Sequence, residues 1–347
     1  MQLMFSECYS LISLDLSNLN TKNVENKKVM IDSCHSLISL NLSSFDTENV
    51  KDMDIMFFNC TSLRFLNLSN FITKNVQTME GIFYNCKSLI SLNISTFDTR
   101  NVINMDLMFS DCDLLVSLNL SNFDTHNVID MEWMFAYCIS LKSLEISSFN
   151  TQNLIYMEGM FYSCNSLTSL HLSNFNTENV ITMDGLFCNC TSLTSLDLSN
   201  FKTQNVENMD WMFELCTSLE FLDISNLKTT KVTSMENMFS NCQSLTSLDT
   251  SSFNTINVIS MERMFYNCSS LTSLDISNFN YENVKNMEQM LYSCNSLKFI
   301  DISSFVVNKN IFLFSQLPNN CSVRINKKSD GKIKTIPNSC DIFLMDL

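Results

Sequence analysis

The sequence of 347 residues contains little glycine and proline, with 4 and 2 residues respectively. Sandwiches and propellers, which need many tight turns, use more of both. The chain also lacks any apolar run close to the ~18 residues of a membrane-spanning helix, so we expect no transmembrane segment. Basic residues are few and the net charge is −15, which argues against nucleic acid as a partner because its binding requires basic patches.

Motifs of catalysis are missing as well. The sequence has no Gly-x-Ser-x-Gly, no phosphate-binding glycine loop and no His-Glu-x-x-His. Its three histidines, His35, His126 and His171, are scattered along the chain rather than clustered. We therefore expect a protein without enzymatic activity, catalytic residues or a cofactor.

What the sequence has in abundance is one repeated unit. A fixed period of about 20–50 residues is typical of solenoids, in which each repeat contacts only its neighbours. Such a protein presents a long surface rather than a deep pocket, so the period favours binding over catalysis. Here the period is 26 residues, marked by twelve cysteines: Cys8, Cys34, Cys60, Cys86, Cys112, Cys138, Cys164, Cys190, Cys216, Cys242, Cys268 and Cys294.

Each repeat contains two apolar rhythms. Leu144 and Ile146 alternate with polar residues, which is the spacing of a strand. A second set is spaced as on one face of a helix, preceded by Thr203 and Asn205 as candidate N-cap residues. This set comprises Val206, Met209, Met212, Phe213 and Cys216. We therefore predict an α/β solenoid of about twelve 26-residue units, each with a short parallel β-strand and a short helix.

The repeat also resembles known families. Its Leu-x-x-Leu-x-Leu core resembles a leucine-rich repeat. The longer pattern Met-Phe-x-x-Cys-x-Ser-Leu, followed by Ser-Asn-Phe-Asp-Thr-x-Asn-Val, is similar to the 26-residue repeat of BspA-like bacterial surface proteins. By this pattern residues 1–305 form the leucine-rich-repeat solenoid and residues 306–347 a C-terminal cap or tail. The resemblance implies a surface protein for recognition or adhesion, with a protein ligand such as a host or extracellular-matrix protein.

Acidic residues recur between the two inward leucines of the strand. In a strand this position faces outward, so we expect it on the concave face of the solenoid. Like charges directly opposite each other destabilise a sheet. One interpretation is a basic partner, or a weak divalent cation held by Asp223, Asp249 and Asp275; the other is that the carboxylates are solvated and screened by salt. The candidate partner-binding acids are Asp197, Asp223, Asp249, Asp275 and Asp301.

Three aromatic residues are further candidates for partner binding. Phe65, Phe221 and Phe299 occupy a strand position that holds serine in other repeats. Exposed aromatic side chains on a recognition surface often anchor a partner. They lie several repeats apart, so we do not expect them to form one patch.

Fourteen of the 15 cysteines fall into two groups, and Cys188 lies two residues before the register position Cys190. The twelve in register coincide with inward-facing methionine and phenylalanine, so we expect them to be buried and reduced, because neighbouring in-register side chains point the same way. Cys321 and Cys340 lie outside the register, and we expect them to form a disulfide if the protein is exported.

Localisation is not fixed by the sequence. No signal peptide is visible, and Met1 aligns with the second-half methionine of other repeats such as Met53, so the chain starts in mid-repeat. Either an export signal has been lost upstream and the protein is secreted or on the cell surface, or the protein is a cytoplasmic scaffold for protein–protein interaction. The sequence leaves the oligomeric state open.

Overall fold

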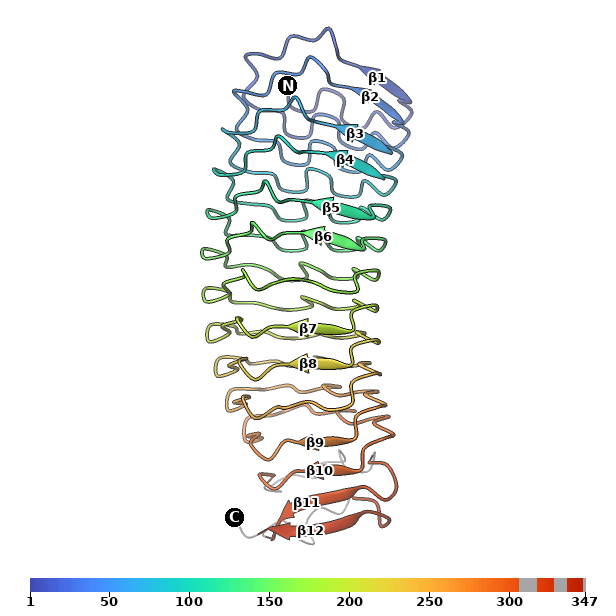
Figure 1. The fold of residues 1–347 in the computed structure, drawn as a ribbon, viewed down its shortest axis with the longest axis vertical. Coiled ribbons are helices and arrows are strands. Elements are labelled where there is room, and N and C mark those ends of the chain that lie inside the picture. The colour runs from blue at the N-terminus through green and yellow to red at the C-terminus, as the bar shows by residue number, and fades with distance from the viewer. Residues whose placement is uncertain (306–316, 328–335, 346–347) are drawn as a thin grey trace. The chain divides into compact units, whose positions relative to one another are not determined.

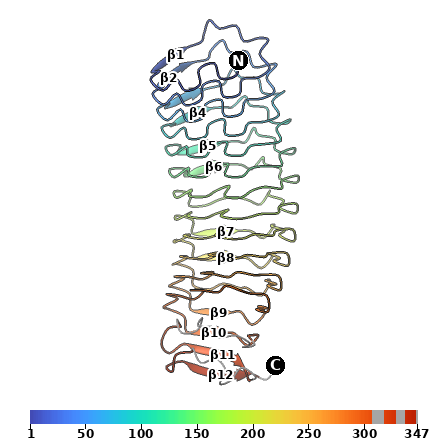
Figure 2. The ribbon, with the colours of Figure 1, turned by 180° about the vertical axis from the view of Figure 1, so that it is seen from behind.

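The computed structural model describes residues 1–305, 317–327 and 336–345. The chain divides into two compact units, Met1–Asn179 (unit 1) and Val180–Leu347 (unit 2). Within each unit, successive turns of a solenoid lie one beneath the other with equivalent segments in step (Figures 1 and 2). The described residues contain short parallel strands and no α-helix.

The strands are short. Those of the 26-residue repeats have three residues each, and two five-residue strands follow near the C-terminus. Unit 1 contains β1 (Ser13–Asp15), β2 (Ser39–Asn41), β3 (Phe65–Asn67), β4 (Ser91–Asn93), β5 (Ser117–Asn119) and β6 (Ser143–Glu145). The described part of unit 2 contains β7 (Ser195–Asp197), β8 (Phe221–Asp223), β9 (Ser273–Asp275), β10 (Phe299–Asp301), β11 (Ser322–Asn326) and β12 (Asp341–Met345).

The strands pair in parallel, and those of the 26-residue repeats place residues 26 apart opposite each other, as in Leu14 and Leu40. This confirms the predicted strand and its register. The ladders are β1–β2, β3–β4 and β5–β6 in unit 1, and β7–β8 and β9–β10–β11–β12 in unit 2. Because each strand offers only three residues, lengthening one or two hydrogen bonds is enough to interrupt a ladder, which accounts for sheets of two strands.

The predicted helix is wrong. The segment from Met209 to Cys216 is a run of tight turns in which Trp211 and Leu215 adopt left-handed φ values of 55° and 59°. Alternate amides point to the next turn: Trp211 N donates to Glu236 O over 2.8 Å. The amides between them bond within the segment, as when Glu214 N donates to Trp211 O over 2.9 Å.

The helical spacing led to a wrong prediction because the spacing of apolar residues indicates which side chains are buried, and not the backbone conformation. Met209, Met212 and Phe213 are fully buried, as the pattern predicts. A left-handed residue costs about 1–2 kcal/mol. In return, alternate amides bond the adjacent turn, which a helix cannot do because its amides bond within it. Thr203 is not an N-cap either, since its Oγ1 donates to Lys228 O of the next turn over 2.8 Å.

Ladders of identical side chains fill the core. Phe57, Phe83, Phe109 and Phe135 stack with ring centroids 5.5–5.9 Å apart. The in-register cysteines after Cys8 are buried free thiols, as predicted. Their Sγ–H groups donate to backbone carbonyls of the preceding turn, for example over 3.1 Å from Cys138 to Phe109 O. Each thiol therefore acts as a small apolar group whose polar hydrogen is satisfied.

The C-terminal segment continues the sheet. β11 and β12 add in parallel to β10, with Ser322 opposite Asp341. Cys321 and Cys340 therefore precede paired positions on adjacent strands. The expected boundary between solenoid and tail falls beside residues 306–316, which lie outside the described residues. No helix among the described residues is long and apolar enough to cross a membrane.

Candidate protein-binding surface

The outward strand face is the surface that the repeat builds most regularly. In β3 and β8 the central leucine is buried and its two neighbours are exposed, as alternation requires. The exposed side chains are held on a backbone that is hydrogen-bonded to the next turn. This gives a rigid platform on which side chains vary while the scaffold does not.

Phe65 and Phe221 project from this face. Their exposed fractions are 64% and 65%, the largest of any apolar residue described. The Arg64 guanidinium lies over the Phe65 ring, 5.9 Å from its centroid. On the strands of the 26-residue repeats, each unit therefore presents one exposed aromatic side chain, where sequence analysis placed candidate anchors; β12 adds Phe343, which is 53% exposed.

Phe299 and Asp301 are placed differently. Asp301 is buried, and Arg324 Nη1 lies 2.9 Å from its Oδ2. The same guanidinium lies over the Phe299 ring, 5.2 Å from the centroid. Both residues thus contribute to the packing of β10 on β11. The repeat pattern did not indicate this because Arg324 lies outside the 26-residue register.

The aspartates of the remaining strand positions have a local structural role. Asp197, Asp223, Asp249 and Asp275 are exposed, and each Oδ1 accepts from the backbone amide two residues later over 2.9 Å. Asn41 makes the equivalent bond over 3.1 Å. The Ser225 amide holds the pKa of Asp223 below its usual value, despite the repulsion of Asp197 and Asp249. The stacked acids therefore satisfy turn amides, a reason that sequence analysis did not consider.

A cation at Asp223, Asp249 and Asp275 stays a prediction. No group of three or more His, Cys, Asp or Glu side chains that could hold a metal ion occurs in the part of the chain that the structure describes. The disulfide between Cys321 and Cys340 also stays a prediction. Both cysteines are free thiols in this structure. The Cys340 Sγ donates to Pro318 O over 3.6 Å.

Sequence analysis missed an exposed apolar column in unit 1. The residue immediately before each strand is Ile12, Ile38, Arg64, Ile90, Val116 and Lys142 in turn. We call these six residues the aliphatic column. The four apolar members are 62%, 56%, 38% and 48% exposed in chain order. Backbone bonds link successive members, as when Ile38 N donates to Ile12 O over 2.9 Å.

Unit 2 differs at the same position. There the equivalent residue is polar and exposed in every repeat: Thr194, Glu220, Thr246, Thr272 and Lys298. The last turn of unit 1 is already polar at this position, with the exposed Thr168. The signal was present in the sequence. It is found by aligning the repeats and comparing the residue type at each outward-facing position from one repeat to the next.

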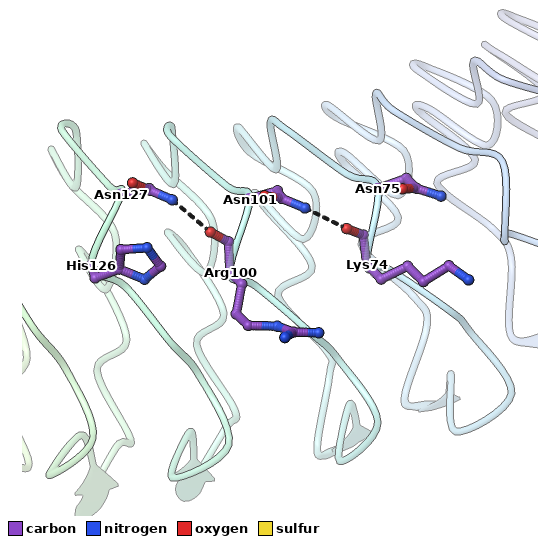
Figure 3. Close-up of a pocket in the computed structure, with 6 residues that line it drawn as sticks. All are labelled: Lys74, Asn75, Arg100, Asn101, His126 and Asn127. Carbon is purple, nitrogen blue, oxygen red and sulfur yellow. Dashed lines mark hydrogen bonds between the residues drawn. The ribbon is translucent and has the colours of Figure 1, made fainter.

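A shallow groove lies on the loops of unit 1. Lys74, Arg100 and His126 project from three consecutive turns, beside asparagines that donate to the loop before (Figure 3). Asn101 Nδ2 donates to Lys74 O over 2.7 Å (Figure 3). Arg100 forms two bonds to Asp98, at 2.7 and 2.9 Å, which hold the pKa of Asp98 below its usual value.

The other two basic side chains of this groove are also paired. Lys74 Nζ lies 2.8 Å from Glu48 Oε1, and His126 Nδ1 lies 2.7 Å from Asp124 Oδ1. The groove is therefore close to neutral. It offers no strong attraction for an anion, despite its three basic side chains.

An acidic column runs along the turns of unit 1, one residue after the first turn methionine. Burial and the neighbouring carboxylates Asp130, Glu80 and Glu132 raise the pKa of Asp106 to about 7. The pKa of Glu132 is also raised to about 7, by burial and by Asp130 and Glu158. One cation lies at the end of this column, where Lys28 Nζ is 3.0 Å from Asp54 Oδ2. The members are Asp54, Glu80, Asp106, Glu132 and Glu158.

These features define a solenoid of the leucine-rich-repeat type, a fold typical of protein–protein interaction. The family described as "Mycoplasma protein of unknown function, DUF285" matches residues 1–115, 90–170, 108–220, 140–247 and 218–323. The chain belongs to this family.

One solved structure shows the same kind of fold. A leucine-rich repeat protein from Bacteroides ovatus ATCC 8483 is similar with a TM-score of 0.51 and 17% identity, over 100% of this chain and 87% of that chain. At this identity the likeness concerns the fold alone. The pneumococcal vaccine antigen PcpA aligns with a TM-score of 0.45 and 13% identity, over 90% of this chain and 78% of that chain. No curated protein matches the chain.

Proposed function

We propose that this protein is a non-enzymatic recognition protein of the BspA-like kind, which acts at the cell surface and binds a protein partner along its outward strand faces. The observation that carries the proposal is the exposure of Phe65 and Phe221, at 64% and 65%, on hydrogen-bonded strands. Large aromatic side chains on a rigid surface lose little entropy when they are buried by a partner. The acidic net charge of −15 favours a partner with basic groups around these contacts.

Binding is tested with the full chain and purified host-matrix proteins on a biosensor. The proposal expects saturable binding that Phe65→Ser or Phe221→Ser weakens about tenfold or more. The control is Ile259→Ser, which removes an apolar side chain that is 43% exposed and lies outside the strands. A change at a buried residue such as Phe201→Tyr would not serve, because it alters the core rather than the surface. Binding that both phenylalanine variants retain would exclude the strand face.

Localisation is tested separately. Intact source cells are treated with a membrane-impermeant amine reagent, and this protein is then isolated. Labelling with a silent cytosolic control supports the surface proposal. An unlabelled protein that becomes labelled after lysis would instead favour the cytoplasmic scaffold.

A further inference from the structure

The aliphatic column of unit 1 points to a particular kind of partner. We propose that it binds an amphipathic helix of the partner protein, laid lengthwise across successive turns, whose carboxylates pair with Arg64 and Lys142. This inference rests on the proposed function and specifies the partner for unit 1. It goes beyond the exposed aromatic residues, because the column was not among the expected binding residues.

Packing within the fold does not explain the column. Single exposed apolar residues are normal on protein surfaces, but here they recur on neighbouring turns. The same scaffold position in unit 2 carries only polar residues, for example Thr246 and Thr272. Since the turns are otherwise alike, the scaffold does not need an apolar residue there. The apolar choice in unit 1 is therefore best explained by something that contacts it.

The spacing of the column selects a helix. Successive turns are about 4.8 Å apart, the distance between hydrogen-bonded strands. A helix advances about 5.4 Å per turn, so its apolar stripe shifts by only about 0.6 Å per turn against the column and stays within about 2 Å of it over three turns. An extended peptide repeats side chains on one face about every 6.7 Å and is out of step after two turns. A helix of about 16 residues spans the column from Ile12 to Lys142.

The charged residues of the column indicate which side chains the partner helix carries beside its apolar stripe. Arg64 and Lys142 form no ion pair within the part of the chain that the structure describes. Most exposed cations elsewhere in unit 1 are paired, such as Lys51 with Glu25 at 3.1 Å, and Lys22 is an exception. In a chain of net charge −15, two unpaired cations within an apolar strip are complementary to carboxylates. They lie three turns apart, roughly 14 Å, which matches helical residues about ten positions apart.

The test uses two peptide libraries selected against the full chain. One library contains helix-stapled 16-residue peptides, and the other contains peptides of equal length held extended in a hairpin. The proposal expects the stapled library to yield binders with apolar residues at every third and fourth position and with glutamate or aspartate flanking them. Their affinities are measured by fluorescence anisotropy.

Variants place the binders on the surface. Ile38→Ser combined with Ile90→Ser, and Arg64→Glu alone, should each weaken binding about tenfold or more. Ile103→Ser is the matched control, since Ile103 is 48% exposed in unit 1 but lies off the column. It should change binding less than twofold. A peptide whose flanking glutamate is replaced by lysine should recover affinity for the Arg64→Glu variant, which a merely structural effect would not produce.

The outcomes separate the two proposals. Peptides that lose affinity only with Phe221→Ser would leave the proposed strand-face function standing and overturn the helix inference. Binders that come from the hairpin library, or that ignore the column variants, would also overturn it. If the aliphatic-column and the Phe65 and Phe221 variants leave both the selected peptides and the matrix proteins bound, both proposals fail.

Discussion

Thr125 and Asn150 are joined twice across neighbouring turns. The Thr125 hydroxyl donates to Asn150 O over 3.0 Å and accepts from Asn150 N over 2.8 Å. Thr125 is completely buried. The same pair of bonds links Thr99 to Asp124, at 2.8 Å each. One hydroxyl thus satisfies both backbone groups of the next turn, which explains why threonine recurs at this position of the repeat.

Replacing Thr125 by valine should therefore destabilise unit 1. Valine keeps the shape but removes the partner of the Asn150 amide and carbonyl, at an expected cost of about 1–3 kcal/mol in the free energy of unfolding. Urea unfolding followed by circular dichroism measures it. Thr125→Ser retains the hydroxyl and should cost about 1 kcal/mol for the lost methyl group. Equal losses in the two variants would show that the hydroxyl bonds contribute little.

Gly159 should resist substitution because of Trp133 on the preceding turn. A Cβ at Gly159 would lie 2.5 Å from Cε3 of the Trp133 ring, and φ is 55°. Gly159→Ala should cost about 2–4 kcal/mol, the sum of overpacking and of a left-handed backbone.

A double mutant separates these two contributions. In a Trp133→Ala background the steric part disappears, so Gly159→Ala should cost only about 1–2 kcal/mol more than Trp133→Ala alone. Thermal unfolding of the four proteins provides the comparison. Additive losses would mean that the indole ring moves aside at no cost.

Lys27 occupies a position that holds methionine in the later turns of unit 1, and it is completely buried. Its Nζ donates to Asp46 O over 2.8 Å and lies 5.3 Å from the Phe45 ring centroid. Burial lowers the pKa of Lys27 to about 8. Lys27→Met should thus stabilise the protein by about 1–3 kcal/mol at pH 7, since a buried charge is exchanged for a side chain that fits.

This gain should depend on pH. The pKa of Lys27 is lower in the folded than in the unfolded chain, so the original protein gains stability as pH rises from about 8 to about 10.4. The difference between the two proteins should shrink over that range. Lys28→Met serves as the contrast, because it removes an ion pair with Asp54 and should not stabilise. A constant gain from pH 7 to pH 10 would contradict the buried charge.

The acidic column should make unit 1 more stable in mild acid. The pKa values of Asp106 and Glu132 are about 7 in the folded chain, well above those of an unfolded chain. The folded state therefore binds protons at these two carboxyl groups more tightly than the unfolded state does. Their contribution to the free energy of unfolding is fully present below about pH 4 and is lost as pH rises through 7. The melting temperature should be higher at pH 5 than at pH 8.

Glu132→Gln should flatten this dependence and raise stability at pH 8 by on the order of 1 kcal/mol, after allowance for solvent screening. Glu48→Gln, which alters an exposed acid paired with Lys74, should leave the slope unchanged. Calorimetry across pH 4 to pH 9 measures both. A melting temperature that rises steadily toward pH 8 would count against proton binding by this column.

The repeat allowed the solenoid of the leucine-rich-repeat type, its strands and the buried ladders to be predicted, but the predicted α/β class was wrong because the described residues form a β-solenoid without α-helices. Leu14 pairs with Leu40 as the period requires, and Phe83 stacks on Phe109. The candidate surface was predicted only in part. Phe65 and Phe221 are exposed as expected, whereas Asp301 is buried against Arg324. The difference arises because Arg324 lies in a segment whose placement the 26-residue period does not describe.

The sequence by itself determined which side chains stack on one another, because a constant period places the same position of each turn beside its neighbour. Only the tertiary structure decided the backbone conformation between the strands and the hydrogen-bond partners of the polar groups. Trp211 is left-handed, with a φ of 55°, because its amide finds a partner in the next turn, at Glu236 O. That carbonyl belongs to the next repeat, so the apolar spacing within a single repeat is equally compatible with a helix.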